Sequence, residues 1–172
     1  MSIITEKIEL ILKNKGLSHY KLSQIINFNE SSLNHMISGR RPFKDETIEK
    51  IASILEVSKE EFDGWILADK YPKETLELAI NAKKMEHNNK LILTTKLDEI
   101  LKSKNLSRTA LSKIIKYSQG GLNEMIIGKE PMSKSVINKI SVALEIQENE
   151  IKGWILADKY SLKVLEVALK EQ

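Results

Sequence analysis

The chain has 172 residues and no cysteine, and its 27 Lys and Arg residues against 24 Asp and Glu residues give a net charge of +3. The lack of cysteine excludes disulfides and thiol chemistry, and so small a net charge does not by itself indicate a nucleic-acid partner. No segment reaches membrane-spanning length and the N-terminal stretch lacks the apolar core of a signal peptide, so we expect a soluble cytoplasmic protein without a membrane partner.

Apolar residues recur at helical spacing along the whole chain, and the three prolines and seven glycines interrupt few segments. This pattern predicts an all-α fold. The first helix is expected to end near Gly16. Ser18 is the predicted N-cap of a second helix and Asn29 that of a third, which Gly39 ends.

Three further helices are predicted before the middle of the chain. The fourth follows Pro42, and the fifth begins with a capping box formed by Ser58 and Glu61. Pro72 then marks the start of a sixth helix, because proline is well tolerated in a first helical turn.

The sequence "GWILADKY" occurs twice, at Gly64–Tyr71 and at Gly153–Tyr160, 89 residues further on. The same offset aligns residues 4–80 with 93–169 without a gap, and nearly half of the aligned positions are identical. The chain is therefore predicted to be a tandem repeat, with a first domain over residues 1–82, a short polar linker over 83–92 and a second domain over 93–172.

The second and third predicted helices of each repeat are short and are joined by a three-residue turn. The segments Leu17–Pro42 and Leu106–Pro131 resemble the helix-turn-helix of the lambda-repressor and Cro family. That family usually has Gly in the turn where Asn27 and Lys116 stand. The resemblance implies two tandem five-helix domains, each here with an added C-terminal helix, that bind double-stranded DNA through the third helix.

The resemblance also implies roles for particular side chains. Polar positions near the start of the third helix would read base edges in the major groove, namely Glu30, Ser31, Asn34, Gln119, Gly120 and Asn123. The first residue of the second helix and the basic residues after the third would contact phosphates, namely His19, Arg40, Arg41, Arg108 and Lys129. In the alternative interpretation, Glu30 only favours a helix N-terminus, Ser31 and Asn34 are solvated surface residues, and the two arginines form an ordinary basic helix end.

Positive charge is concentrated in the middle of each repeat. Residues Lys13–Lys44 include six basic residues and one acid, and residues Lys102–Lys134 include seven basic residues and two acids. Such clusters are what a local polyanion site requires.

The two repeats differ where base reading is expected. Glu30-Ser31-Ser32 in the first is replaced by Gln119-Gly120-Gly121 in the second. We therefore expect two unequal half-sites. The alternative is that the second repeat is a weak backbone binder with a protein-facing role.

The repeated octapeptide places four consecutive apolar residues on one helix, so that helix must be buried on more than one side. We expect one side to face its own domain and the other to face the sixth helix. The predicted packing residues are Trp65, Ile66, Leu67, Trp154, Ile155 and Leu156. The alternative for the tryptophans is a peptide or ligand pocket.

The sequence contains no Gly-rich phosphate loop, zinc signature or catalytic triad, so no enzyme activity, cofactor or metal is expected. The leading hypothesis is a sequence-specific transcriptional regulator, a repressor of bacterial or phage type. The rival is a protein-binding antirepressor or adaptor built on the same scaffold. A homo-oligomer or a protein partner could use the C-terminal helices of each repeat.

Overall fold

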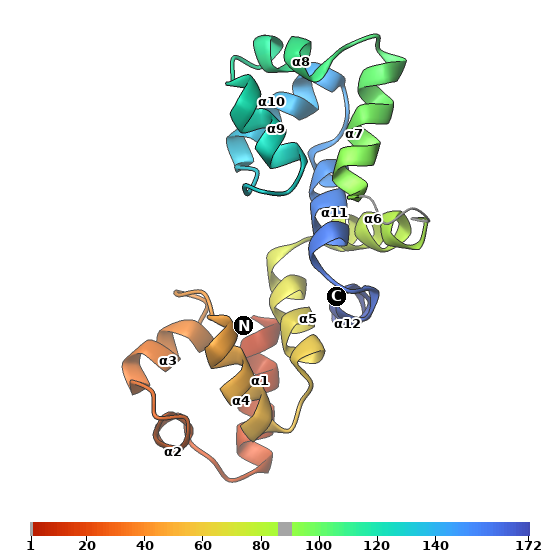
Figure 1. Ribbon diagram of the computed structural model, residues 1–172. Helices are drawn as coiled ribbons and strands as arrows, with labels where there is room; N and C mark the ends of the chain where they lie inside the picture. The colour runs from red at the N-terminus through yellow and green to blue at the C-terminus, as the bar shows by residue number, and fades with distance from the viewer. Residues whose placement is uncertain (1, 86–90) are drawn as a thin grey trace. The chain divides into compact units, whose positions relative to one another are not determined.

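The structure is a computed structural model that describes residues 2–85 and 91–172 (Figure 1). The described residues form twelve helices and no strand, which confirms the all-α prediction. Part of the predicted linker 83–92 lies outside them. The helices are α1 (Ile3–Asn14), α2 (His19–Ile25), α3 (Glu30–Ile37), α4 (Asp45–Leu55), α5 (Lys59–Lys70), α6 (Lys73–Lys84), α7 (Ile92–Ser103), α8 (Arg108–Ile114), α9 (Gln119–Ile126), α10 (Lys134–Leu144), α11 (Glu148–Lys159) and α12 (Leu162–Lys170).

The chain divides into two compact units. Unit 1 consists of the residues up to Pro72 together with Glu166–Gln172, and unit 2 consists of Lys73–Leu165. The domain limits predicted from the repeat, with a linker at residues 83–92, stay a prediction. None of the helices in the described part of the chain is both long enough and apolar enough to span a bilayer.

The helix starts predicted in the first repeat are confirmed. The side-chain oxygens of Ser18 and Asn29 accept hydrogen bonds from the backbone N–H three residues further on, at 3.2 and 2.9 Å. Ser58 and Glu61 form the predicted capping box, with each side chain accepting from the backbone N–H of the other at 3.2 and 3.1 Å. These bonds satisfy amides that the helices themselves leave without a partner.

The turn between the second and third helix of each repeat keeps a left-handed residue without using glycine. Asn27 has a φ of +50° and Lys116 a φ of +51°. A left-handed conformation costs an ordinary residue roughly 1–2 kcal/mol, and Asn less because its side chain bonds locally. Packing of the two flanking helices therefore sets the turn, and the backbone at Lys116 bears the strain.

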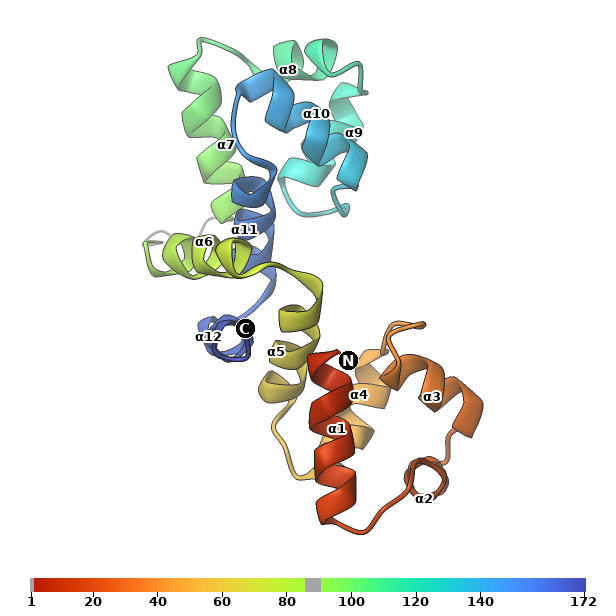
Figure 2. The same ribbon diagram turned by 180° about the vertical axis from the view of Figure 1, so that it is seen from behind.

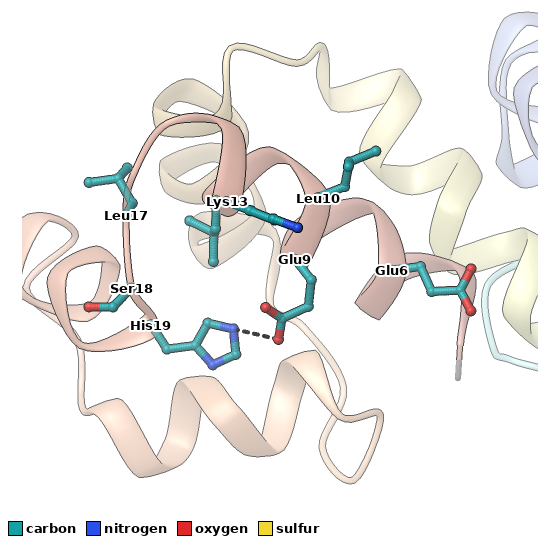
Figure 3. A pocket seen from close by; sticks show the side chains of 8 residues that line it. Glu6, Glu9, Leu10, Lys13, Leu17, Ser18 and His19 are labelled. Carbon is teal, nitrogen blue, oxygen red and sulfur yellow. Dashed lines mark ion pairs between the residues drawn. The ribbon is translucent and has the colours of Figure 1, made fainter.

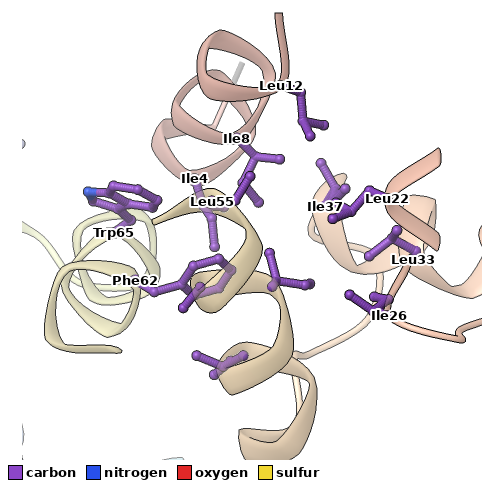
Figure 4. Packing of buried hydrophobic residues seen from close by; sticks show 13 residues of the cluster. Ile4, Ile8, Leu12, Leu22, Ile26, Leu33, Ile37, Leu55, Phe62 and Trp65 are labelled. Carbon is purple, nitrogen blue, oxygen red and sulfur yellow. The ribbon is translucent and has the colours of Figure 1, made fainter. Parts of the chain in front are cut away.

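The core of unit 1 draws one or more buried side chains from each of its first five helices. Ile8 of α1, Leu22 of α2, Leu33 of α3, Leu55 of α4 and Phe62 of α5 are at most 2% exposed and point into one cluster (Figure 4). The repeat places Leu97, Leu111, Leu122, Leu144 and Ile151 at the equivalent positions of unit 2, and each is at most 1% exposed, 0% in most cases.

The octapeptide helices α5 and α11 are crossed closely by another helix of their own unit. A Cβ on Gly64 would lie 2.5 Å from Val167 Cγ1, and a Cβ on Gly153 would lie 3.0 Å from Leu78 Cβ. Glycine at these two positions removes the side chain that would otherwise keep the helices apart. Trp65 and Trp154, the next residues, are 4% and 7% exposed.

The sequence predicted that the octapeptide helix would also face a sixth helix, and the structure shows from which repeat this helix comes. In unit 2, α6 of the first repeat packs on α11, and in unit 1 the last residues of α12 pack on α5. The local cause is the extended conformation of Tyr71 and Tyr160, which end α5 and α11, so that the chain does not fold back along either helix.

The octapeptide also fixes the start of the first helix of its own repeat, a role that the sequence analysis did not assign. The carboxylate of Asp69 accepts hydrogen bonds from the backbone N–H groups of Ile3 at 2.7 Å and Ile4 at 3.0 Å. Asp158 accepts from the equivalent amides of α7 at 2.6 and 3.0 Å. A negative charge at a helix N-terminus is favoured by both the free amides and the helix dipole.

Candidate nucleic-acid interface

The third helix of each repeat, α3 and α9, is here called the recognition helix. In unit 1, α2 and α3 lie on the opposite side of α1 and α4 from α5, as two views show (Figures 1 and 2). Leu33, Met36 and Ile37 bury the inner face of α3 at no more than 2% exposure, whereas Glu30 and Ser31 are exposed. The core therefore holds the helix with its polar face outward.

A hydrogen bond ties the C-terminal end of each recognition helix to the first helix of its repeat. Thr5 Oγ1 donates to the carbonyl oxygen of Ile37 at 2.6 Å, and Thr94 Oγ1 donates to that of Ile126 at 2.7 Å. These bonds occupy carbonyl groups that a helix end leaves free, and they limit rotation of the recognition helix.

The base-reading residues predicted in the first repeat line one shallow hollow of about 510 Å³ together with Arg40. Its lining residues are Glu30, Ser31, Asn34, His35, Ser38 and Arg40. His35 and Ser38 were not among the DNA contacts predicted from the sequence. Their positions four and seven residues after Ser31 place them on the same helical face, which is a signal that the spacing contained.

His19 contacts Asn34 rather than standing alone at the start of α2. Its Nδ1 lies 2.7 Å from Asn34 Oδ1, and its Nε2 lies 3.0 Å from Glu9 Oε1 of α1 (Figure 3). The second contact has ion-pair distance without the alignment of a hydrogen bond. The imidazole is 26% exposed. It therefore links α1 to the recognition helix.

Arg108 makes the equivalent contacts in the second repeat, and makes them more strongly. Its Nε and Nη2 donate to the two carboxylate oxygens of Asp98 at 2.8 and 2.7 Å, and its Nη1 donates to Asn123 Oδ1 at 2.6 Å. The hydrogen bonds to Asp98, followed by its Coulomb attraction, raise the pKa of Arg108 above its ordinary value. The guanidinium thus stays charged and is committed to three bonds inside the protein.

These contacts form two matched sets, called here the carboxylate–cation–asparagine chains. Glu9, His19 and Asn34 form the chain of unit 1, and Asp98, Arg108 and Asn123 form the chain of unit 2. The sequence analysis gave the cation and the asparagine separate roles, as a phosphate contact and a base contact. In both repeats the structure brings the two side chains together.

The first turn of α9 has two glycines where the first turn of α3 has two serines. Gln119 and Gly120 are exposed, and a Cβ on Gly120 would meet no atom within 4 Å. A Cβ on Gly121 would lie 2.8 Å from Ser118 Oγ, which caps the helix. The cap accounts for Gly121, whereas nothing within the chain requires glycine at 120.

The basic residues after each recognition helix have exposed side chains and bonded backbones. The backbone N–H of Arg41 donates to the carbonyl of His35 at 3.0 Å, and that of Lys129 donates to Glu124 at 2.9 Å. Arg40, Arg41 and Lys129 are exposed. Their backbone is therefore fixed while the charged groups remain accessible to solvent.

Over residues 2–85 and 91–172, no group of three or more His, Cys, Asp or Glu side chains is arranged to hold a metal ion.

Comparison with protein families gives a match for each repeat. Residues 96–156 match the Cro/C1-type HTH DNA-binding domain, and residues 8–62 match the family described as Helix-turn-helix. Each matched segment contains the recognition helix of its repeat and the helix before it. No curated protein and no solved structure matches the chain.

Proposed function

Because the chain is a tandem pair of Cro/C1-type helix-turn-helix domains, we propose that this DNA-binding regulator is a repressor that reads two unequal half-sites, one with each recognition helix. The arrangement that carries the proposal is the hollow on α3. Glu30, Ser31 and Asn34 of α3 line this hollow together with Arg40, which follows the helix. The inner face of α3 is buried in the core, so the position of the helix is fixed. A major groove admits one such helix, and a cation beside it can contact the phosphates.

The two half-sites would differ because the reading residues differ. Glu30 can accept a hydrogen bond from the amino group of cytosine, whereas Gln119 can bond adenine through two contacts. Gly120 is exposed and has open space where a Cβ would lie, so the backbone of α9 could approach DNA more closely than that of α3.

One observation supports the rival function of a protein-binding adaptor. Ile25 of α2 and Ile114 of α8, which are equivalent positions, are both 53% exposed. An exposed large apolar side chain at the same position in both repeats is a candidate contact for another protein. The experiment below separates the two functions.

The test is equilibrium binding of the full chain to random and selected duplexes over a range of salt concentrations. Each phosphate neutralised should contribute about −0.9 to the slope of log affinity against log salt. Replacing Arg40 and Arg41 together by Ala should weaken binding to all duplexes and reduce the steepness of the slope by about 2. The matched control replaces Lys50 and Lys59, which pair with Glu46 and Glu49, by Ala and removes the same charge elsewhere in unit 1.

Unchanged slopes in the control variant together with a flatter slope in the arginine variant would support the proposed interface. If the wild-type chain binds no duplex even at low salt, the adaptor function is favoured instead.

A further inference from the structure

The asparagine of each recognition helix is held by a cation, and the chemistry of that cation decides which edge of the carboxamide faces outward. Arginine has N–H donors and no acceptor. Because Arg108 Nη1 lies 2.6 Å from the side chain of Asn123, the atom facing it must be the oxygen Oδ1. The Nδ2 amino group of Asn123 is therefore the part left to contact a ligand.

In the first repeat the same place is taken by His19, and histidine is the residue type that can change its charge in the physiological pH range. Its two ring nitrogens face Asn34 Oδ1 and Glu9 Oε1, and both of these oxygens are acceptors when Glu9 is ionised. Both contacts are attractive only when both nitrogens carry a proton. The contacts of His19 therefore match those of the charged Arg108 only when the imidazole is protonated.

When the imidazole of His19 loses one proton, only one of its two nitrogens can still donate to a neighbouring oxygen. The ionised carboxylate of Glu9 offers only acceptor oxygens, 3.0 Å from Nε2, whereas the carboxamide of Asn34 can turn to present a donor, so we expect the remaining proton on Nε2. Nδ1 then becomes an acceptor facing an acceptor. Rotation of the Asn34 carboxamide by half a turn relieves the conflict by presenting Nδ2 to the ring, and it places Oδ1 on the outer face.

The other charged and titratable groups around His19 do not duplicate this contact. On α1, Glu6 and Lys13 line the same hollow as His19 and Glu9 (Figure 3). On α3, Glu30 and His35 line the hollow around Asn34. His35 is exposed and is a second histidine beside Asn34, so it needs a control of its own.

We propose that the first residue of the second helix is a specificity-determining positioning residue in each repeat: Arg108 locks Asn123 as a hydrogen-bond donor, and His19 makes Asn34 a donor when protonated and an acceptor when neutral. This inference rests on the proposed function, in which the two asparagines face base edges. A donor can bond guanine or thymine, whose major-groove edges carry only acceptors, and also adenine N7, whereas an acceptor can bond only the amino groups of adenine or cytosine.

The experiment is selection of duplexes from a randomised pool by the full chain at about pH 5.5 and about pH 8.5, on either side of the histidine range, with sequencing of the bound DNA. Asn34→Ala and Asn123→Ala identify the base pair that each asparagine reads. Between the two pH values, the ratio of guanine and thymine to adenine and cytosine at the Asn34 position should change about five-fold, as expected for one hydrogen bond. The ratio at the Asn123 position should stay constant.

Exchange of the two cations provides matched controls within one chain. His19→Arg should make the Asn34 position independent of pH and fix its preference for guanine or thymine. Arg108→His should give the Asn123 position a pH dependence that it lacks in the wild type. His35→Gln should leave the wild-type pattern unchanged, and circular dichroism of each variant at both pH values establishes that it is folded.

The outcomes separate this inference from the proposed function. Binding with base preferences that do not change with pH, in both the wild type and Arg108→His, would overturn the inference and leave the proposed function standing. So would asparagine variants that alter no base preference. Absence of duplex binding at either pH would instead be failure of the proposed function itself.

Discussion

The octapeptide helices and the recognition helices of the two repeats differ in how much the rest of the chain constrains them. In Gly64–Tyr71 and its copy, five of the eight positions make a contact that depends on the residue there. Gly64 permits a close helix crossing, Trp65 is buried and Asp69 binds the start of α1. Lys70 Nζ lies 5.4 Å from the ring centre of Tyr71, and the equivalent pair is 5.2 Å apart. At these five positions the identical residues have the same kind of role in both repeats.

The recognition helices show the opposite pattern at their exposed positions. The sequences "ESSLNHMI" and "QGGLNEMI" share Leu, Met and Ile, which face the core, and differ at the first three positions and the sixth. Asn34 and Asn123 are the shared polar residues, and they are contacted by His19 and Arg108. In the recognition helices the core-facing positions are identical between the repeats, and the exposed positions that differ are those we expect to contact different bases.

The largest expected effect tests whether the octapeptide is only architecture. Trp65→Ala or Trp154→Ala should lower the free energy of unfolding by about 3–5 kcal/mol, because each side chain is almost fully buried. Trp65 also contacts Phe62, with 5.8 Å between ring centres, so we expect its loss to be the greater of the two. Denaturant unfolding measures the change, and Tyr20→Ala, which removes a 58% exposed ring, is the control.

Neither tryptophan variant should alter which bases the folded protein prefers. A changed preference in a variant that is still folded would mean that the octapeptide helix takes part in reading, and the contrast between the two regions would fail.

The next effect tests the recognition helix. Asn34→Ala should weaken binding to the preferred site by about 1–3 kcal/mol and weaken binding to random DNA much less, because a base contact discriminates and a phosphate contact does not. Titration of labelled duplexes of both kinds measures the difference. Equal losses would show that Asn34 only positions the protein, as a phosphate contact does.

The sequence predicted the local elements of the fold because local signals determine them. The caps at Ser18, Asn29 and Ser58 depend on residues three positions apart, and the buried face of α3 depends on helical spacing. The partner of each octapeptide helix was not predictable in this way. Leu76 and Ala79 of α6 recur as Leu165 and Ala168 of α12, so the two apolar faces look alike in sequence. Their pattern predicts a buried face without indicating which helix covers it.

For the candidate site, the sequence likewise predicted the local arrangement but not the contacts between helices. Helical spacing placed Glu30, Ser31 and Asn34 on one face, and the structure places them around one hollow. The contact between His19 and Asn34 joins residues 15 positions apart on different helices, and it depends on how α2 packs on α3. Side-chain geometry of that kind follows from tertiary packing, and no local pattern contains it.

A smaller effect tests the aspartate of the octapeptide. Asp69→Ala or Asp158→Ala should lower the free energy of unfolding by about 0.5–2 kcal/mol, because two backbone amides at a helix start lose their acceptor. Asp69→Asn should lose less, since the amide oxygen can still accept one bond but brings no charge to the helix dipole. Thermal unfolding at matched pH measures both. If Asp69→Ala has the same unfolding temperature as the wild type, Asp69 does not contribute to stability, and the structural role of the octapeptide rests on its other residues.

The smallest effect contrasts a glycine of each region. Gly120→Ala in the recognition helix α9 should raise the free energy of unfolding by about 0.5–1 kcal/mol, because Ala favours a helix and the added Cβ meets nothing within 4 Å. Gly64→Ala in α5 should lower it, since the same gain in helix propensity is outweighed by a collision with Val167, 2.5 Å away, and with the backbone nitrogen of Ala168. Unfolding measurements on the two variants should therefore give changes in the free energy of unfolding of opposite sign.

Measurement of duplex affinity then decides why position 120 is glycine. A more stable Gly120→Ala variant that binds its preferred duplex less tightly would mean that the backbone of α9 approaches DNA at this point. A more stable variant with unchanged affinity would contradict that role, and position 120 would be free to carry a side chain.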